Sequence, residues 1–197
     1  MNAKMLSGCL TLKGISRRIT DFGAYSQFNF IEYVNDGVRF LRNQDIGEVL
    51  IYDDEPIYIS EEAYKLLSLK LENGDVVIPR VGTLGKAAET PVLSLPCSAN
   101  QNLAQIKLKK GINPFWVAVF LSTRYGLFQI FRYSTGNVQP WLNLGQIENL
   151  KVFLTSEKGL EDDVIEKAMK SVELNKMSKS LYSQAKNLLL EELGLRD

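Results

Sequence analysis

The feature that most constrains the fold is a long segment without proline or glycine near the C-terminal end of the sequence. It lies between Gly159 and Gly194, and the helix-favouring residues Glu, Lys, Leu, Ala and Met dominate it. Its apolar residues recur every three or four positions, which is typical of a helix with one apolar stripe. Gly194 stands where a glycine commonly ends a helix. We therefore predict one helix over residues 160–193, roughly 50 Å long at about 1.5 Å per residue.

Such a helix is too long to pack entirely on a domain formed by the rest of the chain. We expect part of it to pair with another helix, although a helix that lies along its own domain stays an alternative. The residues expected to contact a partner helix are Ile165, Met169, Val172, Met177, Leu181 and Leu188. The sequence therefore predicts a domain over residues 1–156 and a helical segment over residues 157–197.

Composition excludes several classes of function. A length of 197 residues suits one domain with an appended element, or two small domains, and the hydrophobic fraction of 45% is ordinary for a globular protein with a core. They include 23 basic and 23 acidic residues, so bulk affinity for nucleic acid is not expected. Histidine is absent, which removes His-based acid–base chemistry and the commonest metal ligand.

The cysteines and the hydropathy pattern indicate a cytoplasmic protein. Cys9 and Cys97 are far apart and lack a metal-ligand spacing, so we interpret them as free thiols in a reducing compartment. No apolar run approaches the ~20 residues of a membrane span, and no signal peptide is visible at the N-terminus.

Residues 73–87, NGDVVIPRVGTLGKA, combine a buried strand with a polar turn. The β-branched run from Val76 to Ile78 predicts a short buried strand, which ends at Pro79 or lies at a sheet edge. Gly82 and Gly85 then allow a tight turn. The turn is flanked by Arg80 and Lys86, so it could hold a phosphate or a base edge; a structural turn with solvated charges is the alternative.

The other segments predict an α/β (α+β) domain with a mixed sheet. Before the turn we expect a hairpin from 31–34 and 38–41 around Asn35-Asp36-Gly37, and then a helix capped by Ser60. After the turn we expect strands at 91–95 and 103–108, joined by a polar loop. A helix from Pro114 to about Gly126, a polar loop at 134–140 and a last strand at 151–154 follow.

No motif in the chain indicates catalysis. The turn at Gly82–Lys86 fails as a phosphate-binding P-loop, because Arg80 stands where the first glycine belongs and Ala87 replaces Ser or Thr. Asn113–Trp116 resembles a methyltransferase tetrapeptide that has lost one proline, and no glycine-rich cofactor motif follows a strand. We therefore predict no catalytic residue and no metal ligand. What remains are loops rich in Arg, Asn, Gln, Ser and Thr, the side chains that contact phosphates and base edges.

Four segments in order resemble a known family. They are NGDVVIPRVGTLGKA at 73–87, SANQNLAQI at 98–106, STGNVQPWLNL at 134–144 and the long helix that ends in LLEEL at 189–193. Residues 38–46, VRFLRNQDI, match the family's early strand pattern as well. Together they resemble the specificity subunits of type I restriction–modification systems.

The resemblance implies a fold and a set of partners. Each target-recognition domain in the family is an α/β unit that reads one half of a bipartite DNA site, and a long helix after it packs on a second helix as an antiparallel coiled coil. Full-length subunits usually carry two such units, whereas this chain has one of each and looks like a half subunit. Two copies would then form a homodimer through the helix and read an interrupted palindrome in double-stranded DNA.

The resemblance also implies a non-catalytic role. The chain would direct methyltransferase (modification) subunits, which hold S-adenosylmethionine, and in some systems a restriction subunit. Two alternatives stay open: a coiled-coil scaffold for protein interactions, and the detached recognition region of a fused restriction–methylation enzyme. Because the net charge of the chain is near zero, we expect it to bind DNA weakly by itself. The modification subunits would then supply most of the phosphate contacts. The residues expected to face DNA are Arg17, Arg18, Arg39, Arg42, Asn43, Gln44, Arg80, Thr83, Lys86, Ser134, Thr135, Asn137 and Gln139.

Overall fold

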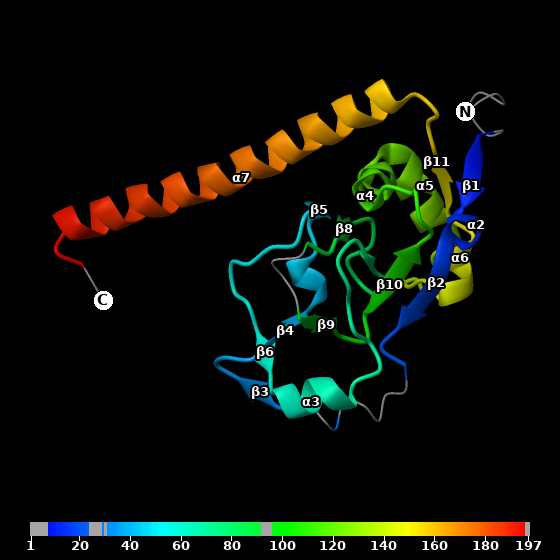
Figure 1. The fold of residues 1–197 in the computed structure, drawn as a ribbon. Coiled ribbons are helices and arrows are strands. Elements are labelled where there is room, and N and C mark those ends of the chain that lie inside the picture. The colour runs from blue at the N-terminus through cyan, green and yellow to red at the C-terminus, as the bar shows by residue number, and fades with distance from the viewer. Residues whose placement is uncertain (1–7, 24–28, 30, 92–95, 196–197) are drawn as a thin grey trace. The chain divides into compact units, whose positions relative to one another are not determined.

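The computed structural model describes residues 8–23, 29, 31–91 and 96–195. The chain divides into two compact units, Met1–Ser156 and Glu157–Asp197. In the described residues, the first unit holds three β-sheets with short helices between their strands, and the second holds one long helix (Figure 1).

The largest sheet has five strands in the order β2-β10-β7-β8-β5. These strands are β2 (Ser16–Asp21), β10 (Leu103–Leu108), β7 (Val76–Pro79), β8 (Ala87–Glu89) and β5 (Glu48–Val49). Neighbours are antiparallel except β5 and β8, so the sheet is mixed, as predicted. Val76, Val77 and Ile78 are fully buried, and β7 ends at Pro79, which confirms the strand predicted there.

A second sheet has four strands in the order β3-β6-β4-β9. They are β3 (Tyr33–Val34), β6 (Tyr58–Ile59), β4 (Val38–Leu41) and β9 (Cys97–Ala99). A two-stranded sheet pairs β1 (Cys9–Thr11) with β11 (Lys151–Phe153). The last strand predicted from the sequence is therefore confirmed, and it pairs with the first strand that the structure describes.

The predicted hairpin between residues 31–34 and 38–41 is wrong. β6 lies between β3 and β4, and Ile59 pairs with both Tyr33 and Val38. Gly37 permits this arrangement, because a Cβ there would lie 2.4 Å from the carbonyl oxygen of Ile59. Asn35-Asp36-Gly37 is a typical hairpin turn sequence, but β6, about 20 residues later in the chain, lies between β3 and β4.

Two other predictions need correction. Residues 97–99 were expected to be loop, but they form β9, which runs parallel to β4. The helix expected from Pro114 to Gly126 is two helices, α4 (Pro114–Ser122) and α5 (Arg124–Tyr133). Thr123 separates them, since its backbone is extended and its side chain accepts a hydrogen bond from the amide of Gly126 at 3.4 Å. The strand expected at 91–95 falls mostly outside the described residues.

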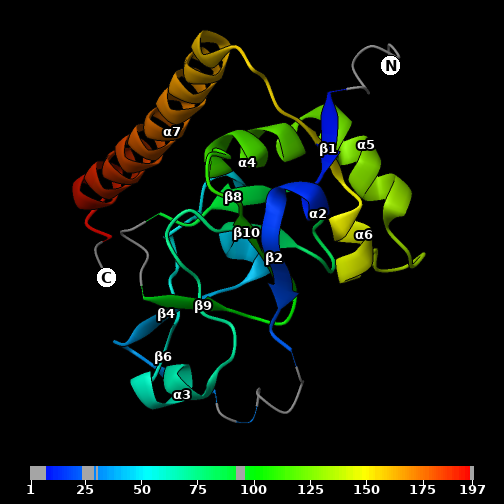
Figure 2. The same cartoon turned by 45° about the vertical axis from the view of Figure 1, so that its right-hand side comes forward.

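The remaining short helices follow local capping chemistry. Ser60 caps α3 (Glu61–Leu66) by accepting from the amide of Ala63, as predicted. Asn143 caps α6 (Leu144–Glu148), α2 (Leu12–Ile15) follows β1, and a 3₁₀ helix, η2, covers Asn43–Asp45. α4 contacts β5, β7 and β8 and covers that part of the five-stranded sheet (Figure 1, Figure 2).

Two apolar clusters form much of the core. One joins Leu41, Val77, Ala88 and Leu103 from both large sheets, and the other packs Phe22 and Phe40 beside α3. Cys97 is a buried free thiol within the first cluster, and burial raises its pKa to about 12. At neutral pH the thiol is protonated and acts as a small apolar side chain.

The second unit is α7 (Lys158–Glu192), a helix of 35 residues, which confirms the predicted long helix. None of the residues from Lys158 to Glu192 is buried. Large apolar side chains are exposed along it, including Met169, Met177, Leu181 and Leu188. Among the described residues no helix is long and apolar enough to span a bilayer.

Candidate nucleic-acid interface

Three of the segments predicted to face DNA meet in the structure. The amide of Gly82 donates to the carbonyl of Pro140 at 3.0 Å, which joins the turn after β7 to the loop at 134–142. The side-chain amide of Asn43 donates to the carbonyl of Val81 at 2.6 Å and ties η2 to the same turn. Polar residues that are about 40 and 60 positions apart in the sequence therefore share one region of the first unit.

The loop at 135–141 is closed by a backbone pair. The amide of Thr135 donates to the carbonyl of Trp141 at 2.9 Å, and the amide of Trp141 donates back at 2.8 Å. Gly136 has φ +92°, and a Cβ there would lie 2.6 Å from the carbonyl oxygen of Gln139, so only glycine fits this position. We call residues 136–140 the loop tip. Asn137, Val138 and Gln139 are exposed at this tip, Val138 completely.

The glycine turn is held against a helix. Gly82 and Gly85 both have positive φ, +79° and +93°, as a tight turn requires. A Cβ on Gly85 would lie 2.5 Å from Cδ2 of Leu127, so the turn packs closely on α5. Thr83 is exposed between the two glycines, and the ammonium group of Lys86 lies 5.9 Å from the ring centre of Tyr52.

Two nitrogen atoms of the Arg80 guanidinium group are bound to the protein. Its guanidinium forms an ion pair with Asp21 at the end of β2, and its Nε donates to the carbonyl of Leu142 at 3.2 Å. The side chains of Arg80 and Asp21 are only 19% and 20% exposed. In this arrangement Arg80 connects the sheet to the loop instead of standing free.

Arg39 and Arg42 are also engaged within the fold. Arg39 is 7% exposed, lies 3.6 Å from the carboxylate of Asp45, and donates to the carbonyls of Tyr52 and Ile57. Arg42 forms an ion pair with the same Asp45 at 3.0 Å and donates to the carbonyl of Glu55 at 2.6 Å. A buried arginine that supplies its donors to carbonyls and a carboxylate stabilises the fold locally and has few donors left for a phosphate.

A small pocket lies beside these arginines. It measures about 250 Å³ and is lined by Arg42, Gln44, Asp45, Tyr52, Asp54 and Glu55. Three of those six residues are acidic, so the pocket does not suit an anion such as phosphate. Gln44 is exposed at this pocket, whereas Asn43 bonds to the turn.

The remaining predicted residues lie on β2 and around the loop. Arg17 and Arg18 are exposed on β2, an edge strand, and Nε of Arg17 donates to the carbonyl of Leu108 on β10. Ser134 ends α5, where its hydroxyl donates to the carbonyl of Phe131, and Thr135 forms the backbone pair that closes the loop. The structure thus brings the turn, η2 and the loop together, while Arg17 bonds to β10 and Arg18 is exposed on β2.

Sequence reasoning missed the exposed aromatic residues of α5 and of the loop. Phe128 and Phe131 on α5 are 71% and 55% exposed, and Trp141 is 40% exposed beside the loop tip. Phe131 also lies near the turn, with Cε2 3.9 Å from the position of a Cβ on Gly85. Apolar periodicity in a helix predicts that its aromatic residues are buried in the core, so the sequence of α5 did not indicate that they are exposed. The one signal of an exposed apolar surface in the sequence was Val138, an apolar residue inside a polar loop.

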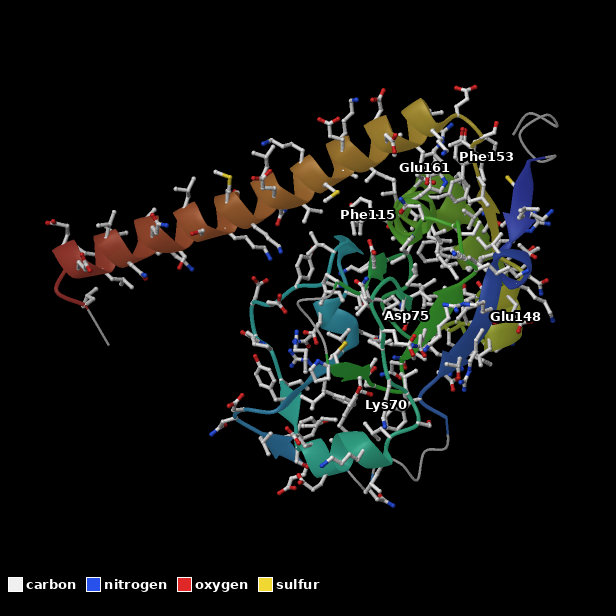
Figure 3. All side chains as sticks on the ribbon, in the orientation of Figure 1. Lys70, Asp75, Phe115, Glu148, Phe153 and Glu161 are labelled. Atoms are coloured by element: carbon white, nitrogen blue, oxygen red, sulfur yellow. The ribbon has the colours of Figure 1, made fainter. Side chains whose placement is uncertain are left out.

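Two carboxyl groups at the five-stranded sheet have a raised pKa: Asp75, directly before β7, and Glu89. Burial raises the pKa of Asp75, which accepts hydrogen bonds from the amide of Glu72 at 2.7 Å and from the side chain of Gln105. Burial likewise raises the pKa of Glu89 in β8. Figure 3 shows Asp75 among the packed side chains of the first unit. Within the described part of the chain, no group of three or more His, Cys, Asp and Glu residues is arranged to hold a metal ion.

A mixed-sheet α/β domain with a braced polar loop, followed by one long exposed amphipathic helix, defines a recognisable class of fold. It is the fold of the S subunits of type I restriction–modification systems, and three solved structures share it. The HsdS subunit from Thermoanaerobacter tengcongensis has 14% sequence identity and a TM-score of 0.58, and the similarity covers 86% of this chain and 39% of that one.

Two further structures agree. The S subunit of a type I system from M. genitalium has 9% identity and a TM-score of 0.54, with 90% of this chain and 42% of that chain covered. A chain from a study of assembly and conformational transition in the type I restriction–modification system has 15% identity, a TM-score of 0.50 and coverages of 90% and 44%. No family model and no curated protein sequence matches the chain. This chain spans less than half the length of the three structures, since the similarity covers 39–44% of each. The resemblance predicted from the sequence is confirmed in the fold.

Proposed function

We propose that this chain is a sequence-specific DNA-recognition subunit of a type I restriction–modification system. The observation that carries the proposal is the fold shared with S subunits over 86–90% of the chain. In this proposal the first unit reads one half of a bipartite site. The chain performs no chemistry itself and brings a methyltransferase to the DNA.

The surface around the loop tip supports this role. The turn and the loop brace each other through backbone hydrogen bonds, so the exposed Thr83, Asn137 and Gln139 are held on a rigid support. Hydroxyl and amide side chains on such a support suit base edges, which require accurate placement of donors and acceptors. Because Arg39, Arg42 and Arg80 are engaged with carboxylates, we propose that the methyltransferase supplies most phosphate contacts.

The exposed helix supports a partner-dependent assembly. Apolar side chains such as Met169, Met177, Leu181 and Leu188 lie in water along α7 of an isolated chain. We propose that they pack against the same helix of a second copy as an antiparallel coiled coil, in a cytoplasmic complex with methyltransferase subunits. S-adenosylmethionine would bind to those subunits, and a restriction subunit would join where the system encodes one.

A methylome tests the proposal. The chain is co-expressed with the methyltransferase encoded beside it, and modified bases are mapped by single-molecule sequencing against a control with methyltransferase alone. We expect a new bipartite site that depends on this chain, and it should be palindromic if two copies assemble. A non-palindromic site would still support the recognition role, but it would contradict a homodimer. No new methylation from a soluble, associated pair of proteins would favour a protein-interaction scaffold.

A further inference from the structure

The loop tip has a chemistry that distinguishes among base pairs. Its exposed side chains are an amide, a branched apolar group and an amide, from Asn137, Val138 and Gln139. Residues 136–140 contain no basic and no acidic side chain. Guanine is read mainly by Arg or Lys, cytosine by an acidic side chain, and adenine by Asn or Gln in a bidentate contact. The tip therefore has the groups for adenine and lacks those for guanine and cytosine.

Both amides at the tip are available to a ligand. Within the described part of the chain, the side chains of Asn137 and Gln139 make no hydrogen bond. By contrast, Asn43, Asn113 and Asn143 bond to backbone groups of the turn or of helix ends. An amide that performs no structural task on a braced loop is suited to bind a partner.

Gln139 has a defined place relative to the turn. Its Nε2 atom lies 3.4 Å from where a Cβ on Gly82 would be, so the amide lies over the glycine turn that bonds to Pro140. Val138 next to it is fully exposed. Val138 can be buried on binding only if the partner has an apolar group to cover it. Thymine has such a group, because its methyl group lies in the major groove on the same base pair as adenine.

From this geometry we propose that the loop tip reads one A·T base pair in the major groove, with Gln139 on the adenine and Val138 against the thymine methyl group. The inference rests on the proposed DNA-recognition function and adds the identity of a base pair to it. Recognition at this position then depends on hydrogen bonds to the base and not on the phosphate backbone.

The test is a change of specificity with a matched control. Gln139→Arg replaces an adenine-reading group by a guanine-reading one, and Asn35→Arg makes the same change of amide to cation at an exposed bend between β3 and β4. Each variant is co-expressed with the methyltransferase, and the methylated motif is compared with that of the unchanged chain. We expect Gln139→Arg to replace A by G at one position of the half-site, with a preference of roughly ten- to hundredfold, and Asn35→Arg to keep the original motif.

Each outcome decides between the two claims. An unchanged motif for Gln139→Arg, or equal weakening at all positions, would overturn the base assignment and leave the DNA-recognition function in place. If the unchanged chain directs no methylation, both fail. If Gln139→Arg is folded by circular dichroism but marks no site, Gln139→Ala decides: loss of preference at one A·T position supports the inference, and retained preference at every position overturns it.

Discussion

Arg80 and Asp21 form an ion pair that crosses strand β10. Asp21 ends β2 and Arg80 follows β7, and both strands pair with β10 from opposite sides, at Ala104. The amide of Leu142 donates to the carbonyl of Arg80 at 2.7 Å, and the Arg80 side chain donates back to the carbonyl of Leu142. Arg80 thus links β2 and β7, the two strands that flank β10, to the loop that carries the exposed amides of Asn137 and Gln139.

We expect Arg80→Ala to weaken DNA recognition without unfolding the protein. The loss acts through the position of the loop, because Arg80 is largely enclosed by Asp21 and Leu142. A double-mutant cycle with Asp21→Ala should give a coupling free energy of about 0.5–3 kcal/mol in urea unfolding. Asp21→Asn keeps the size of the side chain and should reproduce part of the recognition defect. Additive effects of the two alanine changes would show that the pair does not stabilise the fold.

Gly136→Ala should distort the loop tip. Positive φ costs alanine about 1–2 kcal/mol, and the new Cβ would also lie 2.6 Å from the carbonyl oxygen of Gln139. Gly111→Ala is a matched control, since Gly111 has φ +88° but no atom within 4 Å of the new Cβ. Both variants should lose stability in thermal unfolding, and only Gly136→Ala should lose site recognition in the methylome. Equal recognition by the two variants would contradict a role for the tip.

Met177→Pro should break α7 and abolish association. Proline inside a helix removes a hydrogen bond and clashes with the preceding turn, at a cost of about 3 kcal/mol or more. Lys158→Pro is the control, because position 158 begins the helix and the residue before it, Glu157, is already extended. Light scattering should show an assembled form for the unchanged chain and for Lys158→Pro, and a monomer for Met177→Pro. An assembled Met177→Pro would exclude the middle of α7 from the interface.

Asp75 should make the stability of the first unit depend on pH. Burial raises the pKa of Asp75 above its usual value, so the folded state holds the proton more tightly than the unfolded state. Its contribution to stability is full below the usual aspartate pKa, about 4, and is lost as pH rises through the raised value. Asp75→Asn keeps an acceptor for Glu72 and Gln105 but cannot ionise. In urea unfolding from about pH 3.5 to 7, the stability of Asp75→Asn relative to the unchanged chain should rise with pH; a constant difference would contradict this assignment.

The sequence by itself predicted most helices and strands that form because of residues within their own segment. The run Val76–Ile78 is β-branched and became β7, Ser60 caps α3, and a segment free of Gly and Pro became α7. These outcomes follow from side-chain branching, from a hydroxyl that satisfies a free amide, and from helix propensity added over many residues. The order of four segments also indicated the fold that the solved S subunits share.

Tertiary structure alone decided which strands pair and which polar groups remain available. β6 pairs on both sides and displaces the hairpin expected around Gly37, because pairing between distant strands is set by the shared core and not by the turn sequence. Arg39 and Gln139 are both polar residues of candidate segments in the sequence. Only the fold buries Arg39 beside Asp45 and leaves Gln139 exposed on a braced loop, since burial and ion pairing depend on neighbours that are remote in the chain.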